Sequence, residues 1–364
     1  MKIENVFSAF DGMSCGQIAL NRLGIPYKKY FASEIDKPAI KVTQANYPNT
    51  IQLGDIRNIS GYDLPKIDLF LCGSPCQGFS FAGKRLQFDD PRSQLFFEAV
   101  RIFNECKEKN PDIMFLFENV KMGLKNELVF TQYLGVEPIL INSKSVSAQN
   151  RERLYWTNIR AVPHGLFGGM KTTIPQPKNK GLRIKDILED NVDSKYYLSE
   201  KTTERIIKAV NFCNIHNEED KSATLLASNG RQWNAMLCVR QLNPSKESNG
   251  QQPFQQNRIY DSEGLSHALT SQLSVGSNFI AYGGSQDERV FFENSVMGCL
   301  QSGRGDTKTK TLIGERLRRL TPVECERLQT VPDNYTSFVA ETNRYKMLGN
   351  GWTIDVICHI LSYL

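Results

Sequence analysis

The chain has 364 residues, a net charge of +5 and 40% hydrophobic side chains, which fits one large domain with a smaller one. No stretch approaches the ~18 consecutive apolar residues of a membrane span, and residues 1–10 lack a signal-peptide pattern, so we expect a cytoplasmic protein. The mild positive charge allows a nucleic-acid partner without requiring one.

Short apolar runs alternate with helical patterns over residues 1–160. The predicted strands are Asn5 to Phe10, Lys29 to Ser33, Ile67 to Leu71, Ile113 to Phe117, Glu137 to Asn142 and Leu154 to Ile159. Helical patterns between them include Gly16 to Leu23 and Ser93 to Lys109. Strands that alternate with helices predict an α/β fold with a doubly wound parallel sheet.

The composition changes after about residue 165, where glycines and prolines mark a linker. Residues 166–313 are rich in Ser, Asn, Gln and Gly, and their helical periodicity is weak except over Glu200 to Phe212. The short segments 223–225, 268–270 and 299–301 each precede a polar, glycine-containing turn. We predict that residues 166–313 form a smaller, irregular, mostly-β second domain.

Helical patterns return after Gly314. Thr321 is a candidate N-cap, followed by Pro322 at the first helical position and Glu324 three residues after the cap. Trp352 to Leu364 is apolar at helical spacing and should pack on the first domain. We therefore assign residues 1–165 and 314–364 to one domain.

Two strand ends carry candidate ligand-binding residues. Gly12 and Gly16 follow the first strand, where glycine lets the backbone approach a ligand closely. Glu34 ends the next strand, where an acidic side chain can bind ribose hydroxyls. The spacing is not GxGxxG, which disfavours a dinucleotide. An ordinary tight turn explains the glycines equally well.

Cys76 follows a strongly apolar strand, on a loop stiffened by Pro75 and flanked by Gly73 and Gly78. A thiolate at the carboxyl edge of a sheet is a candidate nucleophile. Cys72, inside the strand, better fits a small buried side chain without chemistry. The nine cysteines include no CxxC pair, and the four histidines are scattered, so we expect no metal site.

Glu118 ends another apolar strand, where burial favours a protonated carboxyl, although a strand-end cap or ion pair is an alternative. Arg151 and Arg153 precede the strand that begins at Leu154. Arginines there can bind a phosphate or a base edge, or they form a solvated charge cluster.

Together and in this order, these segments resemble the motif set of the DNA (cytosine-5) methyltransferases. The matching segments are Phe10-Asp11-Gly12 with Gly16, Glu34, Gly54-Asp55-Ile56, Gly73-Ser74-Pro75-Cys76-Gln77, Glu118-Asn119-Val120, Gln149-Asn150-Arg151-Glu152-Arg153, Arg318 to Glu324 with Arg327-Leu328-Gln329, and Gly349-Asn350-Gly351. The resemblance covers residues 1–160 and 314–364. Phe-Asp-Gly in the first motif and Gly-Asn-Gly-Trp in the last resemble the eukaryotic de novo branch, within a compact chain of bacterial or phage type.

The resemblance implies a Rossmann-like fold that uses S-adenosylmethionine, with a target-recognition domain at residues 166–313. It implies catalytic roles for Cys76 as nucleophile on cytosine C6, Glu118 at N3, Arg153 at O2 with Arg151 close by, and Asn119 as an orienting residue. It implies cofactor contacts from Phe10, Asp11, Gly12, Glu34, Ile35, Asp55, Ile56, Pro75, Leu95 and Asn350.

The target cytosine must leave the duplex to react. We expect the loop from Gln77 to Arg92, with Lys84, Arg85 and Arg92, to close over double-stranded DNA, although an ordinary surface loop fits its composition. Arg231 and Arg304 are candidate DNA contacts in the second domain. The resemblance favours a monomer, near the nucleoid if bacterial, in restriction-modification or phage protection.

Three alternatives stay open. A branch with these motifs methylates cytosine in transfer RNA, although this chain's sizeable middle region favours DNA. Some relatives have lost catalysis and act as DNA-binding partners, although Cys76, Glu118 and Arg153 are all present here. A nicotinamide-dependent oxidoreductase would share a Rossmann sheet but would leave Glu118-Asn119-Val120 unexplained.

Overall fold

The computed structural model describes residues 2–75, 91–165, 169–197, 290–292, 297–298, 310–313 and 316–364. Side chains are described for residues 2–75, 94–165, 169–197 and 318–364. The predicted helix at Glu200 to Phe212 and the predicted strands at 223–225, 268–270 and 299–301 lie outside the described residues. The extent of the second domain therefore stays a prediction.

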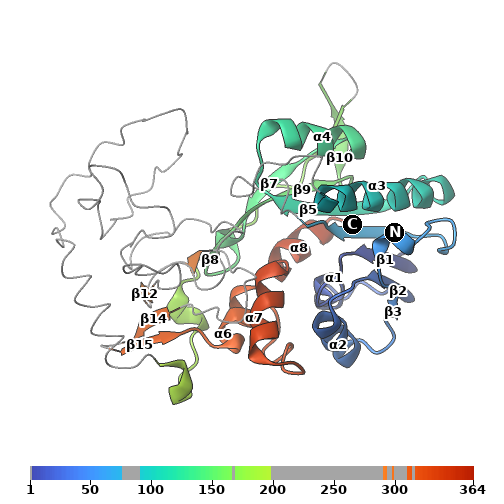
Figure 1. Ribbon diagram of the computed structural model, residues 1–364. Helices are drawn as coiled ribbons and strands as arrows, with labels where there is room; N and C mark the ends of the chain where they lie inside the picture. Colours follow the sequence, from blue (N-terminus) through green and yellow to red (C-terminus); the bar gives the residue numbers. More distant parts are fainter. Residues whose placement is uncertain are drawn as a thin grey trace.

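A seven-stranded sheet forms the centre of the described fold, in the order β3-β2-β1-β4-β5-β9-β7 (Figure 1). Its strands are β1 (Asn5–Ala9), β2 (Lys29–Ser33), β3 (Ile51–Gln52), β4 (Leu69–Gly73), β5 (Met114–Val120), β7 (Ile139–Asn142) and β9 (Glu152–Thr157). The strands β1 to β5 pair in parallel, and β9 runs antiparallel to both of its neighbours. The predicted α/β fold is confirmed, but the expectation of a wholly parallel sheet is wrong at β9. The connection between Asn142 and Glu152 is shorter than the roughly dozen residues of a parallel crossover.

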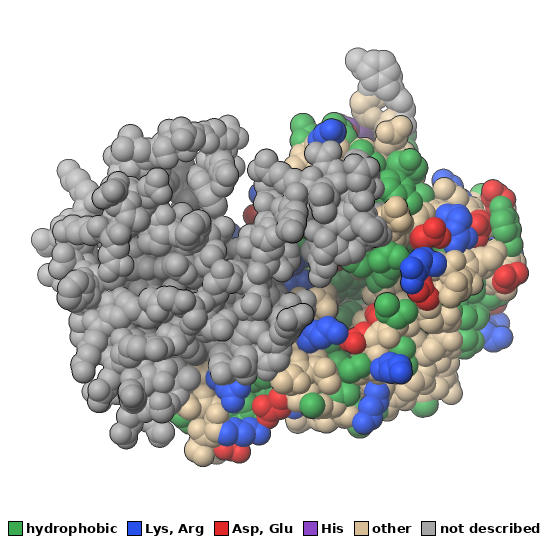
Figure 2. Space-filling model, viewed as in Figure 1, with side chains coloured by type: hydrophobic (Ala, Val, Ile, Leu, Met, Phe, Trp, Pro, Cys, Tyr) green, Lys and Arg blue, Asp and Glu red, His purple; other side chains and the backbone are tan. Residues whose placement is uncertain are grey.

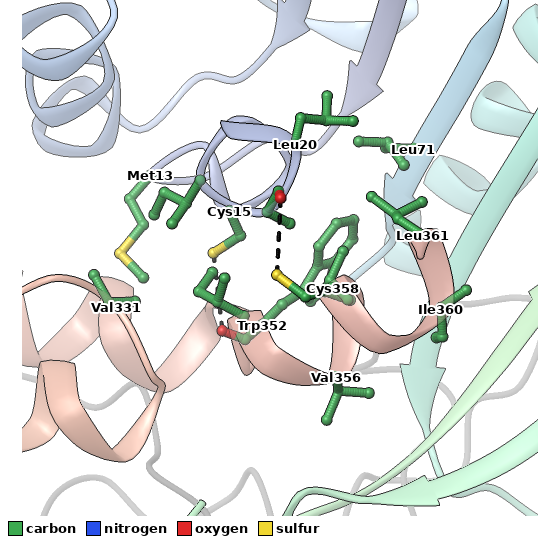
Figure 3. Close-up of a cluster of buried hydrophobic side chains, with 14 of the residues drawn as sticks. Met13, Cys15, Leu20, Leu71, Val331, Trp352, Val356, Cys358, Ile360 and Leu361 are labelled. Atoms are coloured by element: carbon green, nitrogen blue, oxygen red, sulfur yellow. Dashed lines mark hydrogen bonds between the residues drawn. The ribbon is translucent and has the colours of Figure 1, made fainter. Parts of the chain in front are cut away.

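Alternate residues of the strands face two separate hydrophobic clusters, so the sheet is covered on both sides. Val6 and Leu116 belong to one cluster, and Phe7 and Phe117 belong to the other. The first face is covered by α1 (Cys15–Arg22), α2 (Lys37–Asn46) and α8 (Ile354–Leu361), and the second by α3 (Pro91–Lys109) and α4 (Leu124–Leu134). Figure 3 shows α8 packed against α1, where the Cys358 thiol donates to the carbonyl of Ala19. The sheet is therefore doubly wound, as predicted.

The predicted strand at Glu137 to Asn142 is divided into β6 (Val136–Glu137) and β7, because Pro138 lacks the N–H that a continuous ladder needs. Strand β6 pairs with β11 (Gly169–Thr172), which pairs with β10 (Ala161–His164). The remaining strands are β8 (Gln149–Asn150), β12 (Val290–Phe292), β13 (Met297–Gly298), β14 (Lys310–Ile313) and β15 (Arg316–Arg319).

The predicted helix start at Thr321 is confirmed in α6 (Pro322–Leu328). The Thr321 hydroxyl accepts from the Glu324 N–H at 3.1 Å, and the Glu324 carboxylate accepts from the Thr321 N–H at 2.8 Å. Helix α7 (Glu341–Asn350) leads into α8, as the apolar pattern after Trp352 predicted. Short 3₁₀ turns occur at Ile56–Asn58, Ser143–Ser145, Ile184–Ile187 and Ser194–Tyr196.

Acidic and basic side chains are interspersed over the described surface in Figure 2. Within the described residues, no helix is long and apolar enough to cross a membrane. The described part of the chain also holds no cluster of three His, Cys, Asp or Glu side chains arranged to bind a metal ion.

Candidate active site

The carboxyl ends of the parallel strands bring most of the predicted site residues to one edge of the sheet. Phe10 follows β1, Glu34 follows β2, Gly73 ends β4, and Glu118 lies near the end of β5. Ligands of open α/β sheets bind outside this edge. The fold therefore gathers residues that are far apart in the sequence.

The turn after β1 is built around the Glu34 carboxylate. Its oxygens accept from the backbone N–H groups of Gly12 at 2.7 Å, Ile35 at 2.7 Å and Asp36 at 2.8 Å. Gly12 adopts φ 58°, and a Cβ built there would meet nothing within 4 Å. The backbone at Gly12 is therefore open to a ligand, and Phe10, which is half-buried, precedes it by two residues.

Asp11 is buried beneath this turn. The Tyr30 hydroxyl donates to its Oδ1 at 2.8 Å, whereas its Oδ2 has no hydrogen-bond partner among the described residues. Burial raises the pKa of the Asp11 carboxyl to about 6. An unpaired buried oxygen is costly unless a ligand or water donates to it.

Asp55 is occupied by a neighbour. Its carboxylate accepts from the Arg57 backbone N–H at 3.0 Å and from the Arg57 guanidinium, with an Nη2–Oδ2 distance of 2.5 Å. These hydrogen bonds hold the pKa of Asp55 at about 2. A ligand amine that binds the Asp55 carboxylate must therefore compete with Arg57.

The other predicted cofactor residues differ in exposure. Ile56 is buried in the cluster beneath α3, whereas Ile35 is 68% exposed. Pro75 and Leu95 are half-buried, and Asn350 is exposed at the end of α7. Ile35 and Asn350 are therefore accessible to a ligand, and Ile56 supports the fold beneath the 3₁₀ turn.

Glu118 is buried and held by two donors. Arg153 Nε lies 3.1 Å from Oε1, and Trp352 Nε1 donates to Oε2 at 3.0 Å. Because Glu118 pairs with Tyr155, and Arg153 lies two residues from Tyr155, both side chains project from the same face of the sheet. The structure thus joins two residues that the sequence analysis placed in one site.

Asn119 projects to the opposite side of β5 and contacts the loop after β4. Its Nδ2 donates to Ser74 Oγ at 3.0 Å and to Ser74 O at 3.3 Å. Asn119 therefore orients the start of the loop that contains Cys76. Cys76 itself lies outside the described residues.

Arg151 is buried and turned toward the C-terminal segment. Its guanidinium donates to the carbonyls of Gly349 at 3.3 Å and Gly351 at 3.1 Å. These contacts fix the chain just before Trp352, so Arg151 stabilises the segment that carries Trp352.

The contact between Trp352 and Glu118, and the place of Gly73 beneath the indole, were not predicted from the sequence. A Cβ at Gly73 would lie 2.8 Å from Trp352 Nε1, so a side chain there would displace the indole. The available signal was the tryptophan in Gly-Asn-Gly-Trp, which departs from the usual last motif.

The remaining predicted residues divide into two groups. Cys72 is buried, and desolvation raises the pKa of its thiol well above the ordinary value, as expected for a cysteine without chemistry. Lys84, Arg85, Arg231 and Arg304 lie outside the described residues, and Arg92 lies in α3 without a described side chain. Their roles in DNA binding stay predictions.

Comparisons with known proteins agree with this fold. Over residues 1–364, the chain matches the family model described as C-5 cytosine-specific DNA methylase. It is 28% identical to the orphan methyltransferase M.SPRI of Bacillus phage SPR, over 99% of this chain and 97% of that protein. It is 29% identical to the Type II methyltransferase M.HpaII of Haemophilus parainfluenzae, over 96% of this chain and 85% of that protein.

Solved structures with the same fold are more distant in sequence. The Entamoeba histolytica methyltransferase EhMeth has a TM-score of 0.63 at 15% identity, over 100% of this chain and 98% of that one. The S. pombe Dnmt2 methyltransferase has a TM-score of 0.58 at 16% identity, over 99% and 97% of the two chains. The chain therefore belongs to the C-5 cytosine-specific DNA methylase family and is a methyltransferase.

Proposed function

We propose that this protein methylates C5 of a cytosine in double-stranded DNA, with Cys76 as nucleophile and S-adenosylmethionine as methyl donor. The observation that carries the proposal is the buried Glu118 carboxylate, held by Arg153 and Trp352. Glu118 lies opposite Gly73 in the sheet. Gly73 precedes Cys76 by three residues in the chain. A proton source and a nucleophilic loop therefore share one edge.

The turn after β1 fits an adenosyl amino acid. The open backbone at Gly12, the unpaired Asp11 oxygen and the Glu34 carboxylate offer a close approach and two hydrogen-bond acceptors. We assign Phe10 to the adenine face, Glu34 to the ribose, Asp55 to the adenine amine and Asn350 to the methionine end. When bound, S-adenosylmethionine supplies an electrophilic methyl group.

The chemistry requires activation of the cytosine. The Cys76 thiolate adds to C6 while Glu118 donates a proton to N3, and Arg153 binds O2. The C5–C6 electrons become available at C5, which takes the methyl group. The C5 proton is then lost to solvent, the C6–S bond breaks, Cys76 leaves as a thiolate, and the N3 proton returns to Glu118. The protein side chains thus end in their starting state.

The substrate atoms are inaccessible inside a duplex, so the cytosine must be extruded at a cost of about a few kcal/mol. We assign this step to the segment from Gln77 to Arg92, and sequence choice to residues 166–313. We propose a monomer acting on DNA in the cytoplasm, in phage protection or restriction-modification. The similarity to an orphan phage methyltransferase and a Type II methyltransferase supports that role.

The test is transfer of labelled methyl from S-adenosylmethionine to mixed-sequence duplex DNA, followed by bisulfite sequencing. We expect wild type to modify cytosines in one short context, Cys76→Ala to be inactive, and Cys72→Ala to retain transfer. Absence of transfer by wild type to DNA, with methylation of transfer RNA instead, would reassign the substrate. Retained transfer by Cys76→Ala would overturn the proposed nucleophile.

A further inference from the structure

The carboxyl ends of the strands, with Phe10, Glu34, Gly73 and Glu118, form what we call the catalytic edge of the sheet. Trp352 contacts this edge from the C-terminal segment, although no step of the proposed chemistry uses it. We propose that Trp352 is a positioning residue, whose indole N–H fixes the Glu118 carboxyl group for the cytosine. This inference rests on the proposed function, because it assigns Glu118 to activation of the base.

The position of the indole follows from the register of β4 and β5. Gly73 and Glu118 lie directly opposite each other in this parallel pair. A Cβ at Gly73 would come within 2.8 Å of Trp352 Nε1 and 3.1 Å of the adjoining ring carbons. The ring therefore lies over Gly73 and reaches Glu118 Oε2 on the next strand, at 3.0 Å.

The backbone of this segment is held on several sides. Arg151 donates to the carbonyls of Gly349 and Gly351, and Gln329 Nε2 also donates to Gly351 O at 3.3 Å. The Cys15 thiol donates to Trp352 O, with a sulfur–oxygen distance of 3.9 Å (Figure 3). The indole N–H is thus a fixed donor, with little freedom to follow a moving carboxyl group.

The indole is also chemically suited to this task. An indole N–H donates but does not accept, and the same is true of the Arg153 guanidinium. Neither partner can therefore take up the Glu118 proton, which remains available to an acceptor on the incoming base. Because the indole is neutral, it orients the carboxyl group without adding a second positive charge beside Arg153.

The test compares Trp352→Phe with Trp156→Phe. Trp156 is also buried, and its Nε1 donates to a neutral partner, Thr131 Oγ1, at 3.1 Å. One assay follows tritium release from [5-³H]cytosine duplex DNA without a methyl donor, which reports base activation alone. The others measure single-turnover methyl transfer and the Kd values for DNA and S-adenosylhomocysteine.

We expect Trp352→Phe to slow tritium release and methyl transfer by about tenfold, the effect of losing one buried hydrogen bond. Both Kd values should stay within about twofold of wild type, and Trp156→Phe should match wild type in every assay. In a Glu118→Gln background, Trp352→Phe should slow transfer much less, because the partner group is already changed.

Unchanged rates in folded Trp352→Phe would overturn the inference, as would slower transfer explained by weaker S-adenosylhomocysteine binding with normal tritium release. If Trp352→Phe does not fold, Gly73→Ala decides, because its methyl group displaces the indole without removing either partner. Wild-type rates in Gly73→Ala would then overturn the inference. Inactive wild-type enzyme would instead contradict the proposed function.

Discussion

The two ends of the catalytic edge are assembled differently. One end, the β1–β3 end, is defined by Phe10, Gly12, Glu34 and Asp55. The hydrogen bonds of Glu34 and Asp55 there join residues that are close in the sequence. Glu34 binds the backbone of its own two successors and a turn 22 residues away, and Asp55 binds Arg57. At the β4–β9 end, defined by Gly73, Ser74, Glu118 and Arg153, contacts cross the chain. The Glu118–Trp352 contact spans 234 residues.

Because of this difference, we expect cofactor binding to depend on the β1–β3 end and activation of the cytosine to depend on the β4–β9 end. The β1–β3 end can form its turn from local segments, whereas the β4–β9 end depends on β4, β5, β9 and the C-terminal segment together. Substitutions at the β4–β9 end should therefore affect methyl transfer while cofactor binding survives.

The sharpest test of this separation is Glu118→Gln. We expect methyl transfer to fall about 10²- to 10⁴-fold, because the proton donor to N3 is lost. Binding of S-adenosylhomocysteine should be unchanged, because the two groups that hold the Glu118 carboxylate, Arg153 and Trp352, both lie outside the β1–β3 end. Single-turnover kinetics and calorimetry measure the two quantities.

The matched control is Glu105→Gln on α3, whose carboxylate accepts from the Gly61 N–H at 2.6 Å far from the edge. It should transfer methyl normally. A parallel loss of cofactor affinity in Glu118→Gln would show that the two ends are not independent.

Arg151→Met should lower the free energy of unfolding by about 4 kcal/mol, because two carbonyl groups lose their charged donor. Urea denaturation measures this change. Arg101→Met is the comparison, since Arg101 also binds a carbonyl, that of Ile59, but on a half-exposed surface. Its loss should be about 1 kcal/mol or less. Equal losses of unfolding free energy in the two variants would refute a larger contribution of Arg151 to stability.

Asp11, at the β1–β3 end, should make the free energy of unfolding of the protein depend on pH. Burial raises the pKa of Asp11 from 3.8 to about 6, so its stabilisation is complete below pH 4 and is lost as pH rises through 6. A rise in pKa of this size corresponds to about 3 kcal/mol in the free energy of unfolding. Asp11→Asn should therefore gain stability relative to wild type between about pH 4.5 and pH 7, as measured by urea unfolding. A loss of stability of Asp11→Asn relative to wild type over that range would contradict a destabilising, buried Asp11 carboxylate.

The smallest expected effect is at Arg57. Arg57→Ala should tighten S-adenosylhomocysteine binding about two- to fivefold, because the Asp55 carboxylate no longer needs to exchange a surface ion pair for the ligand. Isothermal titration measures the Kd, with Arg22→Ala as the control on a distant ion pair with Asp355. Weaker binding would mean that Arg57 itself supports the cofactor.

The β1–β3 end of the edge was largely predictable from the sequence, and the β4–β9 end was only partly so. Strand β2 matches its predicted range, and the glycine turn and Glu34 follow from nearby residues. Strand β3 was missed because it has only two residues, Ile51–Gln52. The reversed β9 was missed although the short connection before it carried the signal.

The same limit explains the missed role of Trp352. Its apolar surroundings predicted packing, which is confirmed, but no local pattern shows that Gly73 and Glu118 lie opposite each other. Only that pairing creates a place where an indole lies over one strand and reaches the next. Contacts of this kind require the sheet order, which local periodicity does not contain.

The position of α8 also has a consequence for how the chain matures. During synthesis, residues 2–165 emerge before α8, so the face of the sheet that carries Val6 and Leu116 lacks one of its covering helices until α8 has been made. The Glu118–Trp352 contact therefore forms late. A nascent chain can form the turn after β1 early, but the indole that contacts Glu118 is in place only after translation has passed Trp352.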